Sequence, residues 1–209
     1  IIGSDYPGMK PTMAVREGDR VKLGQLLFTD KKNPGVQFTA PAAGIVVAIN
    51  RGERRAFQSL VIDVDGDKAE KFASFKAGEL GSLERAAIVD NLVNSGQWVA
   101  LRTRPYSKIP QVDSIPSSIF VTAMDTNPLA ADPAPIISQR SEDFVNGLTV
   151  LTGLTQGPVN LCVAPQSGVA GDEVDGVREV AFSGPHPAGL AGTHIHYLDP
   201  VSANKTVWT

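Results

Sequence analysis

The chain has 209 residues, of which 42% are hydrophobic and 20% are charged, a composition typical of a folded globular protein. Its net charge of −3 and its pI near 5.6 argue against nucleic-acid binding, which needs a basic surface. No run approaches the about 20 apolar residues of a membrane-spanning helix, and the first residues lack the pattern of a secretory signal. The chain begins at Ile1 without an initiator Met, so we expect it to be part of a longer protein.

The charges are unevenly distributed. Residues 1–76 carry 12 Lys and Arg against 9 Asp and Glu, a balance of +3, whereas residues 77–209 carry 7 against 13, a balance of −6. A solvated surface is the favoured interpretation of the basic part, with a docking face as the alternative. The single cysteine, Cys162, excludes an internal disulfide. It lies in an apolar run, so we expect a buried, unreactive thiol.

Residues 1–75 are predicted to form a small all-β module. Apolar runs at 15–28, 36–49 and 60–64 are joined by turn residues such as Asp65-Gly66-Asp67, and none has a helical period.

The period changes in residues 76–209, which we predict to be an α/β (Rossmann-like) domain. A helix is expected from Ser82 to Gly96 and a second from Ser141 to Gly157. A buried parallel strand is expected at 115–124, and further strands are expected at 159–164 and 177–182. Strands alternating with helices predict an α/β layer.

Two strings of the first part resemble biotinyl and lipoyl carrier domains: VREGDRVKLGQLL at 15–27 and FTAPAAGIV at 38–46. The resemblance implies a barrel-sandwich fold whose carriers bear a modified lysine at a hairpin tip. Matching the flanking pairs puts Asn33 at this tip, with Lys31 and Lys32 beside it. We therefore expect an interaction module without the carrier function, because a fold does not dictate a function. A stand-alone carrier or binding module on this scaffold is the alternative.

Four longer strings look like the hydrophilic first subunit of the bacterial Na⁺-translocating NADH:quinone oxidoreductase. They are DKKNPGV at 30–36, WVALRTRP at 98–105, FVTAMDTNPLA at 120–130 and GPHPAGLAGTHIH at 184–196. The resemblance runs from about Tyr6 to Trp208. Members of this family continue well beyond residue 209, so we expect the α/β domain to be incomplete at its C-terminus.

This resemblance implies a peripheral subunit on the cytoplasmic face of the bacterial inner membrane. It implies a six-subunit complex that passes electrons from NADH to ubiquinone and exports Na⁺. FAD, FMN, riboflavin and iron–sulfur centres are expected in the partner subunits, and membrane subunits are the expected neighbours. The chain itself would have no cofactor, no catalytic residue and a structural, quinone-proximal role, so the fragment alone should be inactive.

The α/β part also looks like a distant relative of the flavin domain of respiratory NADH dehydrogenases. Those relatives place a glycine-rich loop after the first helix, where bare N–H groups approach phosphate. Here Trp98 and Leu101 occupy the comparable stretch, which has no glycine after Gly96. We therefore expect no flavin site, although Arg102 and Arg104 are candidate anion ligands. No GxGxxG, P-loop or GxSxG motif occurs.

The three histidines, His186, His194 and His196, lie close together in the sequence. If 192–196 were a strand, His194 and His196 would share a face and, with His186, form a metal site. The favoured interpretation is a loop whose imidazoles bond the backbone or a neighbouring subunit, because no acidic or Cys ligand accompanies them. A quinone contact is a third alternative, which depends mainly on the family resemblance.

Asp125 and Asn127 follow a predicted buried strand, at the position where α/β folds form ligand sites. They are candidate quinone or partner contacts. The simpler interpretation is that both side chains cap the turn before Pro128.

Overall fold

The computed structural model describes residues 1–209 and divides them into two compact units. The first contains residues 1–74, 89–102 and 107–114. The second contains residues 75–88, 103–106 and 115–209. The sequence suggested one division after residue 75. In the structure, consecutive segments between residues 75 and 114 belong alternately to the second and the first unit.

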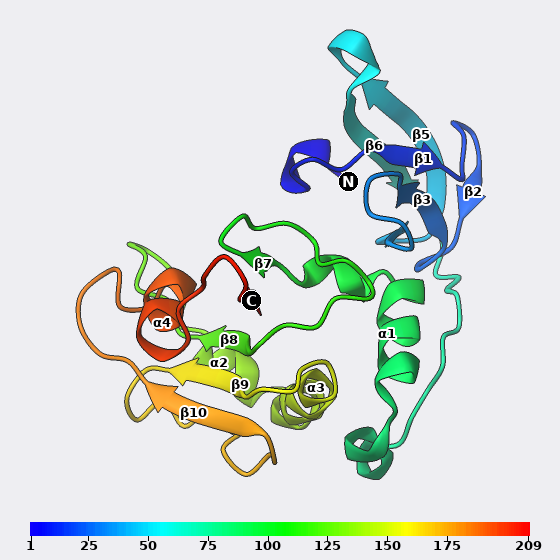
Figure 1. The fold of residues 1–209 in the computed structure, drawn as a ribbon. Helices are drawn as coiled ribbons and strands as arrows, with labels where there is room; N and C mark the ends of the chain where they lie inside the picture. Colours follow the sequence, from blue (N-terminus) through cyan, green and yellow to red (C-terminus); the bar gives the residue numbers. More distant parts are fainter. The chain divides into compact units, whose positions relative to one another are not determined.

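The first unit is built from two three-stranded antiparallel sheets, in the orders β1-β3-β4 and β2-β5-β6 (Figure 1). The strands are β1 (Pro11–Met13), β2 (Arg20–Val21), β3 (Leu26–Asp30), β4 (Gln37–Thr39), β5 (Gly44–Arg51) and β6 (Phe57–Val64). Phe28 and Phe38 are buried between them, with stacked rings 4.6 Å apart. Alternating apolar side chains thus form the core of the predicted β module.

Short 3₁₀ turns complete this unit: η1 (Gly3–Asp5), η2 (Glu53–Arg55) and η4 (Gln97–Ala100). Helix α1 (Arg85–Asn94) begins in the second unit and ends in the first. Its apolar stripe is divided accordingly, because Ile88 is buried in the second unit and Val93 in the first. One predicted helix therefore contributes to two cores.

The second unit contains a five-stranded sheet in the order β10-β9-β8-β11-β7. The strands are β7 (Thr103–Arg104), β8 (Ile119–Ala123), β9 (Val159–Val163), β10 (Val177–Ala181) and β11 (Val207–Trp208). Strands β8 to β11 pair in parallel, and only β7 runs antiparallel to its neighbour. Every residue of the interior strand β9 is buried, as expected for a parallel strand covered on both faces.

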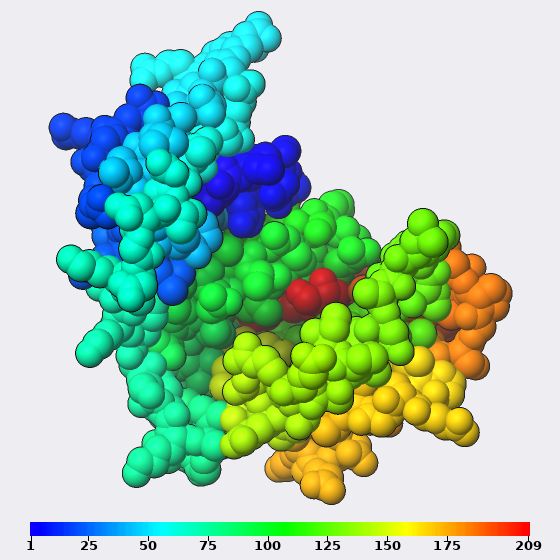
Figure 2. All heavy atoms as spheres, turned by 180° about the vertical axis from the view of Figure 1, so that it is seen from behind, coloured from blue at the N-terminus to red at the C-terminus, as the bar shows by residue number.

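Helices cover both faces of this sheet. The remaining helical elements are η3 (Ala77–Ser82), α2 (Ala134–Ser138), α3 (Ser141–Thr152) and α4 (Ala191–Leu198). Ile195 of α4 clusters with Cys162 of β9, whereas Leu148 of α3 and Leu161 of β9 both approach Gly171. Consecutive strand residues point to opposite faces, so α3 and α4 lie on opposite sides of the sheet. Figure 2 shows α2 and α3 on the surface, with the red C-terminal residues beside them.

The structure confirms several predictions and corrects one. The predicted strands at 115–124, 159–164 and 177–182 and the helix from Ser141 are present. Cys162 is fully buried, as expected, and burial raises the pKa of its thiol to about 12. The stretch 192–196, for which a loop was the favoured interpretation, is instead part of α4. No helix in the structure combines the length and apolar character that crossing a membrane requires.

Candidate functional site

A crevice of about 370 Å³ lies at the carboxyl end of β8, in the second unit. Met124 and Asp125 leave the strand here, and α4 begins at Ala191 on the other side of the crevice. The other lining residues are Thr122, Asn127, Ala131, Pro133, Gly189 and Leu190. The position is the one where open α/β sheets bind ligands.

Asp125 and Asn127 form one hydrogen-bonded turn at the edge of this crevice. Oδ1 of Asp125 accepts hydrogen bonds from the backbone N–H of Asn127 at 2.7 Å and from its Nδ2 at 2.8 Å. This local bonding matches the simpler interpretation made from the sequence, in which both side chains shape the turn. Both residues are exposed, so their remaining polar atoms also face solvent.

Thr126 joins this turn to the loop that contains the first histidine. Its Oγ1 accepts a hydrogen bond from the backbone N–H of Gly189 at 2.9 Å and lies 3.4 Å from Nδ1 of His186. A Cβ on Gly189 would lie only 2.6 Å from the backbone nitrogen of Thr126. A side chain at position 189 would therefore push the two loops apart.

His194 lies inside the second unit and is fully buried. Its Nε2 is 2.9 Å from the carbonyl oxygen of Ala188, and its ring lies 4.2 Å from that of Phe182. Desolvation lowers the pKa of His194, and the bond to the Ala188 carbonyl opposes this shift only partly. The imidazole is therefore neutral at pH 7, bonded to the backbone as the favoured interpretation expected.

The three histidines do not converge. His194 and His196 are two residues apart on a helix, so they lie about 200° apart around its axis rather than on one face. His196 is exposed and contacts the ring of Tyr197, while His186 lies in the exposed loop before α4. No group of three or more His, Cys, Asp or Glu side chains is placed to hold a metal ion.

The electrostatics of the crevice differ from those of a phosphate cradle. Asp125 is its only charged lining residue, and no lysine or arginine lines it. A phosphate would therefore meet a carboxylate without a compensating cation. The crevice suits an uncharged polar group, with Met124, Pro133 and Leu190 as apolar neighbours.

The stretch that would carry a flavin loop packs in the first unit instead. Trp98 is fully buried, and its Nε1 donates a hydrogen bond to the carbonyl oxygen of Pro110 at 3.0 Å. Gly96 has a left-handed backbone, and a Cβ there would lie 2.2 Å from Oγ1 of Thr39. The stretch is closely packed by side chains, so its residues do not fit a flavin phosphate.

The two candidate anion ligands of this stretch are separated. Arg104 belongs to β7 and the second unit, where its backbone pairs with Val207. Arg102 stays in the first unit and donates from Nη1 to the carbonyls of Val99 and Leu101, the latter at 3.0 Å. Arg102 and Arg104 are therefore close in the sequence but do not form one anion site within either unit.

The tip of the β3–β4 hairpin is attached to a loop of its own unit. Nδ2 of Asn33 donates hydrogen bonds to the carbonyls of Ile109 at 3.2 Å and Pro110 at 3.0 Å. A carrier domain needs a free tip with the lysine at its apex, whereas here Asn33 takes that position and is bonded to another loop. The contact with residues 109–110 was not predictable from the sequence, because 76 residues separate Asn33 from Ile109.

The two units define a class of protein in which a barrel-sandwich β module accompanies an α/β domain. Two family models match the chain: the NqrA N-terminal barrel-sandwich hybrid domain over residues 1–65 and the NqrA second alpha/beta domain over residues 83–209. The chain belongs to the NqrA family. The predicted family and the predicted fold class are both confirmed.

Curated relatives match the chain along its whole length. A protein of Saccharophagus degradans is 64% identical over 209 residues, which are 100% of this chain and 47% of the relative. Proteins of Marinomonas sp. and Pseudomonas aeruginosa are 61% and 60% identical, and the chain covers 46% of each. All three are named as the A subunit of Na(+)-translocating NADH-quinone reductase. The chain spans about half the length of these relatives.

Proposed function

We propose that the chain is the N-terminal part of the NqrA subunit of a Na⁺-translocating NADH:quinone oxidoreductase. The observation that carries this proposal is the identity of 64% across the whole chain with a relative of that name. The complex transfers electrons from NADH to ubiquinone and couples this transfer to Na⁺ export. This chain acts in it as a scaffold without a redox centre.

The distribution of cofactors follows from this role. FAD, FMN, riboflavin and iron–sulfur centres belong to partner subunits of a six-subunit assembly. Two observations support this assignment: Trp98 is buried in the stretch that would carry a flavin loop, and the crevice after β8 has no cation. The subunit is peripheral, bound to membrane subunits on the cytoplasmic face of the inner membrane.

Within this role, the crevice after β8 is the candidate contact for a quinone headgroup or a neighbouring subunit. Asp125 and Asn127 line it, and His186 is held beside it by Thr126. His196 is exposed on α4 and is available to a partner, whereas the buried His194 supports the loop from inside. The polar edge and apolar walls suit an uncharged quinone ring.

Assembly in a native membrane tests the proposal. The full-length parent, with an affinity tag, is expressed in a bacterium from which the corresponding gene has been deleted. We expect it to copurify with membrane subunits of the complex and to restore Na⁺-dependent NADH:quinone reductase activity. Recovery of the parent alone from the soluble fraction, with no restored activity, would contradict the assignment.

Two measurements on the 209-residue chain separate this proposal from the carrier alternative. We expect no NADH oxidation and no visible flavin absorbance from the purified chain. Its intact mass should equal the sequence mass, because Asn33 occupies the hairpin tip where carriers bear a lysine. An added biotinyl or lipoyl mass would favour the stand-alone carrier.

A further inference from the structure

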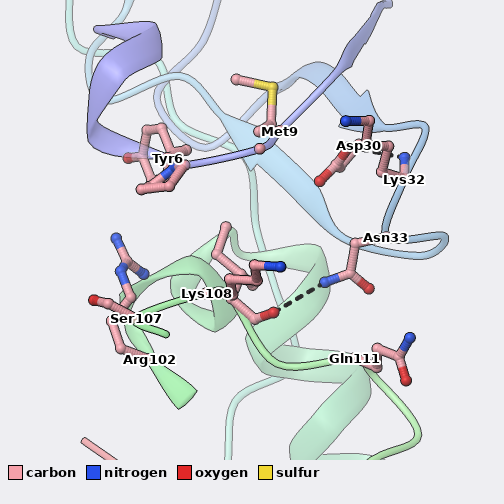
Figure 3. A pocket seen from close by; sticks show the side chains of 12 residues that line it. Tyr6, Met9, Asp30, Lys32, Asn33, Arg102, Ser107, Lys108 and Gln111 are labelled. Carbon is pink, nitrogen blue, oxygen red and sulfur yellow. Dashed lines mark hydrogen bonds between the residues drawn. The ribbon is translucent and has the colours of Figure 1, made fainter. Parts of the chain in front are cut away.

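A second cavity, of about 350 Å³, lies entirely within the first unit. Three segments surround it: the N-terminal residues 6–9, the β3–β4 hairpin tip, and residues 102–111. Figure 3 shows Asp30 and Asn33 of the hairpin on one side of the cavity and Arg102 and Lys108 on the other. Its volume is in the range that holds small-molecule ligands.

Positive charge predominates around this cavity. Lys32, Arg102 and Lys108 line it against a single carboxylate, Asp30, which leaves a balance of +2. Neither Lys32 nor Arg102 forms an ion pair with Asp30, whose Oδ1 instead accepts the backbone N–H groups of Lys10 and Lys32 at 2.9 Å each. The charges of Lys32 and Arg102 are therefore not neutralised locally, which favours an anionic ligand.

Arg102 is held in place to meet such an anion. Its Nη1 donates to the carbonyls of Val99 and Leu101, and its guanidinium lies 5.6 Å from the centre of the Tyr6 ring. These contacts hold the guanidinium while leaving Nη2 and Nε without a protein acceptor. Arginine binds phosphate through paired N–H groups, so a fixed guanidinium costs less entropy on binding.

A carboxylate accompanies the cations. Asp30 lines the cavity and is only 7% exposed, and its Oδ2 accepts no hydrogen bond from the protein. A ligand hydroxyl can donate to this oxygen in a charge-assisted hydrogen bond. Oδ1 of Asn33 is enclosed by protein, so the ligand does not reach it.

The backbone at the cavity wall is also strained. Ser107 lines the cavity with φ of +52°, a left-handed conformation that costs a non-glycine residue free energy. Strain of this kind persists where the surrounding structure requires it, often at ligand sites.

We propose that this cavity binds a small phosphate monoester that carries free hydroxyl groups. Lys32 and Arg102 bind the phosphate, Lys108 adds positive charge to the wall, and Asp30 accepts a hydrogen bond from a hydroxyl. The site is independent of the quinone crevice, which lies in the other unit. It differs from that crevice in chemistry too, because cations predominate here and none lines the crevice.

Calorimetric titration of the full-length protein at low ionic strength tests this proposal, with glycerol 3-phosphate, inorganic phosphate and glycerol as probes. We expect saturable binding of glycerol 3-phosphate, at least about tenfold tighter than inorganic phosphate, and no binding of glycerol. Arg102→Lys and Lys32→Gln should each weaken binding about tenfold or more, because each loses a charge-assisted contact. Asp30→Asn should abolish most of the preference for the hydroxyl-bearing ester.

Lys31→Gln is the matched control, since Lys31 is the neighbouring lysine of the same hairpin and does not line the cavity. It should bind glycerol 3-phosphate as the unaltered protein does. Thermal midpoints of all variants show whether they are folded. The proposal is overturned if no probe binds, if inorganic phosphate binds as tightly as the ester, or if Lys31→Gln weakens binding as much as Lys32→Gln.

Discussion

The carboxamide of Asn33 donates a hydrogen bond to the carbonyl oxygen of Pro110 across 3.0 Å. The same oxygen accepts the indole N–H of Trp98, also at 3.0 Å. One backbone carbonyl thus connects the β3–β4 hairpin tip to the stretch that follows Gly96. These are the two segments in which the sequence suggested a carrier tip and an obstructed flavin loop.

Replacing Asn33 tests how much this connection stabilises the first unit. Asn33→Ala removes two hydrogen bonds to backbone carbonyls, and we expect a loss of about 1–3 kcal/mol in the free energy of unfolding. Urea unfolding followed by circular dichroism measures the change. The control is Asn50→Ala, which removes one exposed bond, from Nδ2 to the Ser59 hydroxyl at 2.9 Å, and should cost about 0.5 kcal/mol or less. Equal losses in the two variants would contradict the structural role of Asn33.

Replacing Trp98 tests whether its side chain only packs the core of the first unit or also blocks a flavin site. Trp98→Ala should destabilise the protein by about 3–5 kcal/mol, because it leaves a large cavity and removes a donor from Pro110. We also expect no gain of FMN binding in fluorescence titrations, since the stretch still lacks the glycines that admit a phosphate. Tyr106→Ala serves as the control, because that ring is 76% exposed and its loss should have little effect. Submicromolar FMN binding by the Trp98 variant would show that the indole alone blocks a site.

The reactivity of the Cys162 thiol tests whether its side chain is buried in the folded protein. Burial raises the thiol pKa to about 12, so at pH 8 we expect almost no reaction with a thiol reagent in the folded protein and complete reaction after unfolding. Rapid labelling without denaturant would contradict this expectation.

The same pKa makes a prediction about alkaline stability. A folded-state pKa above the unfolded value of about 9 gives a contribution that is fully present below pH 9 and is lost as the pH rises towards 12. Stability should therefore fall less steeply between pH 9 and pH 11 in Cys162→Ala than in the unaltered protein. Denaturant midpoints measured across this range give the two slopes, and equal slopes would exclude a contribution from the thiol.

His194 should make stability depend on mildly acidic pH. Its folded pKa is lowered by desolvation from 6.5, so its contribution to stability is present above about pH 6.5 and is lost as the pH falls below it. His194→Gln should reduce the slope of stability against pH between 7 and 5. The unaltered protein, measured over the same pH range, is the reference, and an equal slope in the two proteins would contradict a contribution from His194. The slope of stability against pH is compared, so the test remains valid even if His194→Gln lowers the stability at every pH.

Several features could be predicted because they depend on local patterns. Alternating apolar residues at 60–64 and the helical stripe from Ser141 identified their elements, since burial of one face imposes a period of two or 3.6 residues. The apolar neighbours of Cys162 indicated its burial for the same reason. The position of Asn33 at a hairpin tip followed from the resemblance to carrier domains, and β3 and β4 do form that hairpin.

Tertiary structure decided what depends on distant residues. The Gly- and Pro-rich stretch around 184–196 ends in a helix because Ile195 packs against Phe120 and Cys162, and this placed His194 and His196 on different sides. Likewise, the cationic cavity brings together Lys32 and Arg102 from segments 70 positions apart in the chain. Such contacts result from packing and hydrogen bonding across the fold, which a local sequence pattern does not encode.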